Sequence, residues 1–300
     1  MHVFGGPWTQ LKLDLVESYL SAWALVMKNQ KFKRLYIDGF AGSGRWQPKA
    51  AELTEAMESD LLGELDSQPS SSGAEARDGS ALRALAITPE FDGLVFIENN
   101  PQRAAELRGL DPSGKRRILI KEQDANSAIQ QVCARPEWRK GHGAWRGVLF
   151  LDPYGNSVEW QTLEAIRDTG AIDVWYLLPL MGLYRNAARN SASITPDKRA
   201  SITRILGTES WEADWYSSTG ELDLFGEMRI PQREADVKQI TVWVKNRLRA
   251  LFPVVEGPKL LPESGAPMFA LFFLMSSDSK NAQKRGRAIA GHILRAGNSS

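Results

Sequence analysis

YIDGFAGSG, residues 36–44, is a short strand-forming run that passes directly into a glycine-rich turn. At the end of a first parallel strand, glycine lets the backbone approach a ligand closely, because there is no Cβ to clash. Gly42 and Gly44 form a G-x-G pair, but Gln47 stands where a dinucleotide-binding turn has its third glycine. The stretch therefore predicts the opening of a doubly wound sheet, with a turn for a cofactor other than NAD.

Short apolar runs recur downstream and alternate with segments of helical character. The runs lie at 94–98, 117–121, 148–152 and 172–178, and the helical segments at 8–28, 101–110, 125–134 and 160–168. This alternation is typical of a parallel sheet covered on both faces. A helix at 240–252, a strand and hairpin at 253–267, a strand at 268–275 and a basic helix at 281–294 complete the pattern. We predict one Rossmann-like α/β domain over residues 1–300, with a mostly parallel sheet closed by an antiparallel pair.

Polar residues follow these strands at the edge where doubly wound sheets bind ligands. Asp38 opens the turn and suits a polar cofactor group such as an ammonium. Glu98 ends the second strand, where an acid can bind both hydroxyls of a ribose. Asp124 and Ala125 follow the third strand, where they can contact an adenine; alternatively, Asp124 caps the next helix. Asp152 ends the fourth strand.

The composition is that of a soluble globular protein, 43% hydrophobic and 24% charged, with a net charge of +1. Any contact with nucleic acid must therefore come from a local patch. One cysteine, Cys133, and three scattered histidines do not indicate a disulfide or a structural metal, and they suit a cytoplasmic protein. The longest apolar run, 268–275, is too short to span a bilayer, and we expect no signal peptide and no membrane contact.

Two regions interrupt the alternation. Residues 47–79 combine an acidic, helix-like stretch with QPSSSG at 68–73, which indicates an insertion that is either a lid or a disordered loop. Residues 181–239 are rich in Trp, Tyr, Arg and Ser and follow the fifth strand. They form either a substrate-recognition segment or a helical cap that buries Trp211 and Trp215.

Motifs spread over nearly the whole chain resemble the three-Cys-motif partner proteins, in the same order. They are FGGPWTQLKL (4–13), YIDGFAGSGRW (36–46), DGSALRAL (78–85), FIENN (96–100), QDAN (123–126), FLDPYG (150–155) and APMFALFFLMSS (266–277). The cysteines of the name belong to the partner. The resemblance implies a class I methyltransferase fold and a complex with a three-Cys-motif protein. It also implies an S-adenosylmethionine site, formed by Asp38, Phe40, Ala41, Gly42, Gly44, Glu98, Asp124 and Ala125.

More distantly, the chain is similar to the adenine-N6 methyltransferases of large-subunit ribosomal RNA. Those enzymes carry a D-x-x-A-G-x-G-R turn, a Gly-Ser-Pro and a DPPY. This chain has Ala81 after Ser80 in place of the proline, and DPYG in place of DPPY. In amino-group methyltransferases the aspartate and the proline carbonyl accept the N–H bonds of an exocyclic amine, and the aromatic ring stacks on the base. The resemblance implies these catalytic roles for Asp152, Pro153 and Tyr154, although Tyr154 comes one place early.

Four residues are candidates for substrate binding: Lys12, Ser80, Tyr184 and Arg185. Lys12 lies in an N-terminal helix that such enzymes fold over the cofactor, where it can contact phosphate or stay solvated. Ser80 follows from the Gly-Ser pair. An arginine next to an aromatic residue at 184–185 suits phosphate contact together with base stacking.

We therefore expect an S-adenosylmethionine-dependent methyltransferase that acts on an amino group of a nucleic-acid base. The alternative is a partner protein, with or without bound S-adenosylmethionine, whose function is to complex a three-Cys-motif protein. The near-zero net charge and the altered DPPY motif favour this alternative somewhat. A methyltransferase that acts on a protein or a small molecule is a third possibility.

Overall fold

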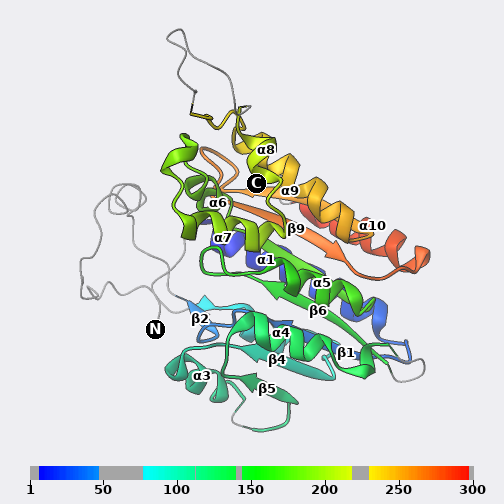
Figure 1. The fold of residues 1–300 in the computed structure, drawn as a ribbon. Helices are drawn as coiled ribbons and strands as arrows, with labels where there is room; N and C mark the ends of the chain where they lie inside the picture. The colour runs from blue at the N-terminus through cyan, green and yellow to red at the C-terminus, as the bar shows by residue number, and fades with distance from the viewer. Residues whose placement is uncertain (1–6, 47–76, 112, 140–143, 218–229, 297–300) are drawn as a thin grey trace, which may run out of the picture.

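A seven-stranded sheet forms the centre of the computed structural model, which describes residues 7–46, 77–111, 113–139, 144–217 and 230–296 (Figure 1). The strand order is β5 (Ile118–Lys121), β4 (Gly93–Ile97), β1 (Lys33–Asp38), β6 (Trp145–Leu151), β7 (Ile172–Leu178), β9 (Phe269–Met275) and β8 (Val254–Leu261). The first five strands are parallel, and β9 runs antiparallel to both of its neighbours. The predicted α/β fold, with its closing antiparallel pair, is confirmed.

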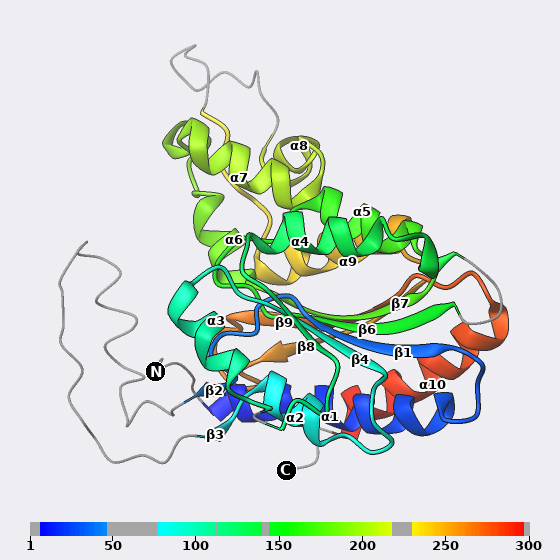
Figure 2. The ribbon, with the colours of Figure 1, turned by 90° about the horizontal axis from the view of Figure 1, so that it is seen from below.

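Helices cover both faces of the sheet, as predicted (Figure 2). One face carries α1 (Pro7–Met27), α2 (Ser80–Ala86), α3 (Pro101–Arg108) and α10 (Lys280–Ala296). The other carries α4 (Ala125–Cys133), α5 (Trp160–Asp168) and α9 (Val237–Leu251). No helix within the described ranges is long and apolar enough to cross a membrane.

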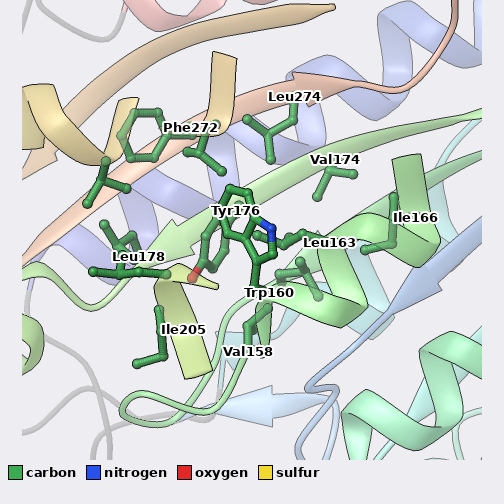
Figure 3. Packing of buried hydrophobic residues seen from close by; sticks show 14 of the residues in the cluster. Val158, Trp160, Leu163, Ile166, Val174, Tyr176, Leu178, Ile205, Phe272 and Leu274 are labelled. Carbon is green, nitrogen blue, oxygen red and sulfur yellow. The ribbon is translucent and has the colours of Figure 1, made fainter. Parts of the chain in front are cut away.

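Alternation along the strands explains the two layers. In β1, Tyr36 packs with the cluster under α1, and Ile37 with the cluster under α4, because successive side chains point to opposite faces. Figure 3 shows the α5 side, where Tyr176 of β7 packs with Trp160 and Leu163 of α5. Both faces of the central strands are buried, so these strands read as continuous apolar runs.

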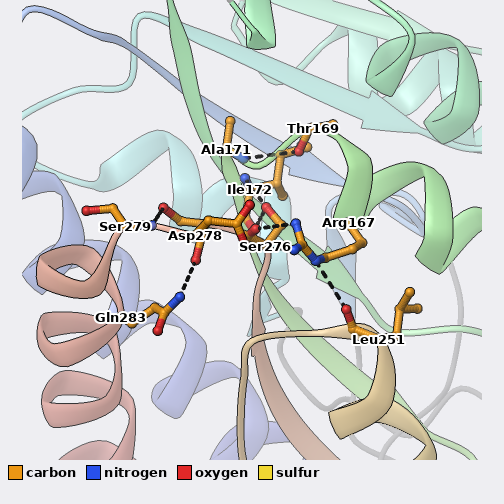
Figure 4. Close-up of polar contacts among 10 residues, drawn as sticks. Arg167, Thr169, Ala171, Ile172, Leu251, Ser276, Asp278, Ser279 and Gln283 are labelled. Atoms are coloured by element: carbon orange, nitrogen blue, oxygen red, sulfur yellow. Dashed lines mark hydrogen bonds and ion pairs between the residues drawn. The ribbon is translucent and has the colours of Figure 1, made fainter.

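Polar contacts fasten the amino-terminal edge of the sheet. Arg167, at the end of α5, donates to the backbone oxygens of Leu251 at 3.1 Å and Ser276 at 2.9 Å, and pairs with Asp278 at 2.7 Å (Figure 4). The Ser276 hydroxyl and the backbone of Ile172 bond to each other, which joins the end of β9 to the start of β7. The antiparallel strand is thereby held against its parallel neighbour.

Segments outside the sheet gather at its carboxyl edge, the end at which α3 and α6 lie in Figure 2. There α6 (Leu180–Asn186) leads through η4 (Ser191–Ser193) to α7 (Pro196–Leu206) and α8 (Trp211–Trp215). Trp211 and Trp215 are fully buried, and the Trp215 ring lies edge-on to Trp243 of α9 at 5.4 Å. Packing thus accounts for both tryptophans. Residues 218–229 of the predicted recognition segment lie outside the described residues.

The predicted insertion begins and ends at paired strands. β2 (Arg45–Trp46) runs antiparallel to β3 (Arg77–Asp78), with Trp46 opposite Arg77. The Arg77 guanidinium lies 5.6 Å from the centre of the Trp46 ring. Residues 47–76, for which a lid or a disordered loop was expected, lie outside the described residues.

Candidate cofactor and substrate site

The topology brings the acidic strand ends together. Asp38, the last residue of β1, pairs with Phe96 of β4 on one side and with Phe150 of β6 on the other. Glu98 and Asp152 each follow two residues after these partners. Because the three strands are parallel, the three carboxylates lie at one edge, at the centre of the sheet.

The glycine turn crosses the ends of both neighbouring strands. Gly39 N donates to Phe150 O at 2.9 Å, and Ala41 N donates to Ile97 O at 3.0 Å. Gly42 has φ +60°, and a Cβ built on it would meet nothing within 4 Å, so the turn is open on this side. Gly44 has φ +80°, and a Cβ there would lie 2.6 Å from Leu110 Cδ1. Gly42 therefore faces open space, and Gly44 allows close packing against Leu110.

Asp38 lies beneath the turn and is fully buried. It accepts hydrogen bonds from Phe40 N and from the Tyr36 hydroxyl, both at 3.2 Å, and from Ser80. Burial raises the pKa of Asp38 to about 6; the three hydrogen bonds oppose the shift, and the charge of Asp152 adds to it. In this arrangement, Asp38 holds the turn through Phe40 N and the start of α2 through Ser80, and does not face solvent.

The segment before α2 packs directly on the turn. Gly79 N donates to Gly44 O at 2.9 Å, and a Cβ on Gly79 would lie 2.8 Å from the same oxygen. The φ angle of Gly79, −81°, would suit any residue. Glycine is needed at 79 because a side chain there would clash with the backbone of Gly44. Ser80, predicted to bind substrate, forms a hydrogen bond with Asp38.

Glu98 directly follows β4, three residues before α3 begins, and is buried. Its Oε1 accepts a hydrogen bond from Asn100 N at 2.8 Å, and Arg103 Nη1 lies 3.7 Å from the same atom. Asn100 in turn caps α3 by accepting from Gln102 N and Arg103 N. The carboxylate is therefore held in place at the strand end, as the predicted binding of ribose hydroxyls by Glu98 would require.

Asp124 is exposed and caps α4, with Ser127 N donating to its Oδ1 at 2.9 Å. Capping was one of its two predicted roles. Ala125, next to it, is buried. The neighbouring Asn126, which belongs to the same QDAN motif but was given no role from the sequence, makes three hydrogen bonds. Its amide donates to Ser157 O at 2.8 Å, and its Oδ1 accepts from Glu159 N at 3.0 Å and from the Thr162 hydroxyl at 2.8 Å. Asn126 thus ties α4 to the loop after β6.

Lys12 reaches across from α1 to Asp152. Its Nζ lies 2.5 Å from Asp152 Oδ2, and the two side chains are only 12% and 25% exposed. This position differs from a solvated lysine on a helix face. Pro153 is buried, and Tyr154 is 77% exposed. An ion pair therefore lies at the strand end where the sequence resemblance leads us to expect the catalytic residues.

Two further contacts fix the helix that carries Lys12. Arg83 of α2 pairs with Asp14 and Glu17 of α1, both at 2.7 Å, and donates to Asp78 O at 3.2 Å. Sequence reasoning missed Arg83, since a single arginine in a short helix carries no signal of its partners. The same arginine therefore joins α1, α2 and the end of β3.

Tyr184 and Arg185 lie in α6, at the same edge of the sheet. The guanidinium of Arg233 lies 3.5 Å from the centre of the Tyr184 ring and donates to the backbone oxygens of Tyr184 and Ala187, both at 2.6 Å. One face of the Tyr184 ring is thus covered by a cation. Arg185 is exposed. Among the described residues, no group of three His, Cys, Asp or Glu side chains could hold a metal ion.

No family model matches this chain, and no curated protein matches it in sequence. Among solved structures, protein LPL1258 from Legionella pneumophila, of family DUF519, has a TM-score of 0.51 at 12% identity, covering 98% of this chain and 92% of that one. Two others are provisionally named methyltransferases. One is yhhF from Escherichia coli, with a TM-score of 0.32 at 15% identity, covering 79% of this chain and 92% of that one. The other is named as S-adenosylmethionine-dependent and comes from Listeria monocytogenes, with a TM-score of 0.36 at 10% identity, covering 87% of this chain and 98% of that one. The likeness to LPL1258 extends over the whole fold.

Proposed function

We propose that this chain binds S-adenosylmethionine at the carboxyl edge of its sheet and transfers the methyl group to an amino group of a nucleic-acid base. The observation that carries the proposal is the place of Asp152, at the end of the strand next to β1 and close to the buried Asp38 under the glycine turn. A carboxylate at this strand end, close enough for its charge to raise the pKa of the buried Asp38, suits an acceptor for an amine N–H.

The residues at the edge fit the cofactor. The open side of Gly42 gives room for its methionine half, Glu98 suits the ribose hydroxyls, and the segment at 124–125 suits the adenine. When bound, S-adenosylmethionine supplies an electrophilic methyl group on a sulfonium. Asp38, being fully buried, supports the proposal as the residue that shapes the turn, through Phe40 N and Ser80.

Asp152 and the Pro153 carbonyl would orient the amine. Both accept hydrogen bonds, so together they can bind the two N–H groups of an exocyclic amine and aim its nitrogen lone pair at the methyl group. Asp152 also suits the uptake of the proton that the amine loses. The ring of Tyr154, which is 77% exposed, would contact the base.

The test separates cofactor binding from transfer. Calorimetry measures S-adenosylmethionine binding, and labelled cofactor incubated with separate DNA, RNA and protein pools measures transfer. We expect Asp152→Ala to lower transfer by at least a hundredfold with cofactor affinity within threefold of wild type. The matched control is Asp278→Asn, which removes an ion-paired carboxylate at the opposite edge of the sheet. Loss of cofactor affinity together with activity would contradict the role of Asp152.

A second candidate function is that of a partner protein for a three-Cys-motif protein, which the sequence resemblance supports. The observation in its favour is that the strand-end carboxylate already has a partner in Lys12. If labelled cofactor binds but no pool is methylated, and a purified three-Cys-motif protein co-elutes with this chain, the partner function is the better description.

A further inference from the structure

The Lys12–Asp152 pair presents a difficulty for the proposed reaction. Asp152 has to accept an N–H from an amine, yet the structure gives one of its oxygens to an ammonium 2.5 Å away. A carboxylate whose charge is neutralised by a close cation is a weaker acceptor than a free one. The pair must therefore open, or at least loosen, before the amine can bind.

We propose that the Lys12–Asp152 pair is a latch that a phosphate of the nucleic-acid substrate opens, by drawing Lys12 to itself and freeing Asp152 for the amine. This inference rests on the proposed function and gives it a substrate class. The substrate has to carry an anion close to the reacting amine.

Only the lysine side chain has to move. The helix α1 is fastened by Arg83, through Asp14 and Glu17, and by the buried Asp173, which accepts from Tyr19 at 2.7 Å and Trp23 at 3.0 Å. Lys12 has a flexible four-carbon stem with a rotatable ammonium at its end. The ammonium can therefore leave Asp152 while α1 remains on the sheet.

The surrounding charges explain why an anion is needed. Asp38 is fully buried, and the charge of Asp152 contributes to its raised pKa, so the two carboxylates interact. If the Lys12 ammonium moves away and nothing takes its place, these carboxylates lose their cation. Separating a half-buried ion pair in this way costs free energy. A phosphate gives Lys12 a new partner, and the amine gives Asp152 one. A neutral nucleoside supplies only the second of these.

The test is a double-mutant cycle on the binding of a fluorescein-labelled single-stranded RNA 12-mer of mixed sequence, measured by anisotropy without cofactor. If the latch exists, Asp152→Asn frees Lys12 and tightens RNA binding about three- to tenfold. Lys12→Met weakens RNA binding about three- to tenfold and lowers the slope of log affinity against log salt concentration by about 1. The double variant should bind like Lys12→Met, because tightening by Asp152→Asn requires Lys12. Lys284→Met, on the exposed face of α10, is the matched lysine control.

Each other outcome overturns the latch. The pair is merely structural if Asp152→Asn weakens RNA binding or leaves it unchanged. The same holds if Asp152→Asn tightens binding equally when Lys12 is also replaced, or if RNA binds to none of the variants. If Lys12→Met lowers S-adenosylmethionine affinity tenfold, the cofactor carboxylate is the anion that Lys12 binds. Thermal melting checks that the variants fold.

The two proposals fail separately. RNA binding that follows the cycle, with no methyl transfer to any pool, leaves the latch standing and removes the methyltransferase function. Methyl transfer to a nucleic acid, without a tightening of RNA binding that depends on Lys12, leaves the methyltransferase function standing and removes the latch.

Discussion

The Tyr19 hydroxyl donates a 2.7 Å hydrogen bond to Asp173, which lies 154 positions further along the chain. Trp23 donates to the same oxygen at 3.0 Å, so the first helix is pinned to the start of β7 by one buried carboxylate. Burial raises the pKa of Asp173 to about 7, although the two hydrogen bonds and the charge of Arg146 oppose the shift. The anchor of the helix that carries Lys12 is therefore sensitive to protons.

Replacing Asp173 should change how stability depends on pH. Because the pKa in the folded protein lies above the ordinary value of 3.8, the folded state binds more protons between about pH 4 and pH 7. The free energy of unfolding therefore falls as pH rises through this window. Asp173→Asn keeps an acceptor for Tyr19 and Trp23 but cannot ionise. Thermal melts should show it more stable than wild type at pH 8, by roughly 3 °C or more, and the gain should be clearly smaller at pH 5. Equal differences at both pH values would contradict the assignment.

Gly79→Ala should damage the cofactor turn. The added Cβ would lie 2.8 Å from Gly44 O, a backbone atom that cannot move aside without shifting the turn. We expect a loss of about 1–3 kcal/mol in the free energy of unfolding and a weakening of S-adenosylmethionine binding of about tenfold or more. Urea denaturation and calorimetry measure the two effects. Gly291→Ala in α10 is the control, since its Cβ would meet only the flexible end of Arg295; the prediction is wrong if the two variants behave alike.

Arg83→Met should loosen α1 while leaving the sheet intact. Its partners Asp14 and Glu17 are 51% and 41% exposed, so the two ion pairs together contribute about 1–2 kcal/mol. Hydrogen exchange should become faster in α1 and stay unchanged in β6. Arg83→Lys, which keeps the charge, should recover part of the protection. If hydrogen exchange in α1 is unchanged, Arg83 does not hold the helix that positions Lys12.

Asn126→Ala should loosen the loop that follows Asp152. It removes the donor to Ser157 O and the acceptor for Glu159 N and Thr162, and leaves buried polar groups without partners. Such groups cost about 1–3 kcal/mol each, so we expect a fall of about 2–4 kcal/mol in the free energy of unfolding. Chemical denaturation measures this fall, and Asn190→Ala, a cap of an exposed 3-10 turn, should lose far less. A smaller loss for Asn126→Ala than for Asn190→Ala would show that the bridge is unimportant.

The sheet could be predicted because its signals are local. Buried parallel strands read as short apolar runs, and those at 94–98 and 172–178 lie within a residue of β4 and β7. The glycine turn also identified the first strand of the doubly wound sheet.

The contacts within the site could not be predicted, because they join residues far apart in sequence. Lys12 meets Asp152 across 140 positions, and Arg83 meets Asp14 across 69. Nothing in the local pattern distinguishes these lysine and arginine side chains from solvated ones. Whether Asp38 faces a ligand or lies beneath the turn likewise depends on Ser80, which lies 42 positions further along the chain and is brought to Asp38 only by the packing.

The pairing of Trp46 with Arg77 has a consequence for how this protein can vary. Residues 46 and 77 lie opposite each other, although 30 residues separate them in the sequence. The entropy of closing such a loop grows only slowly with its length. The stretch between the two residues is therefore exchangeable in principle, and relatives with the same glycine turn can differ widely in length at this one point without rebuilding the sheet.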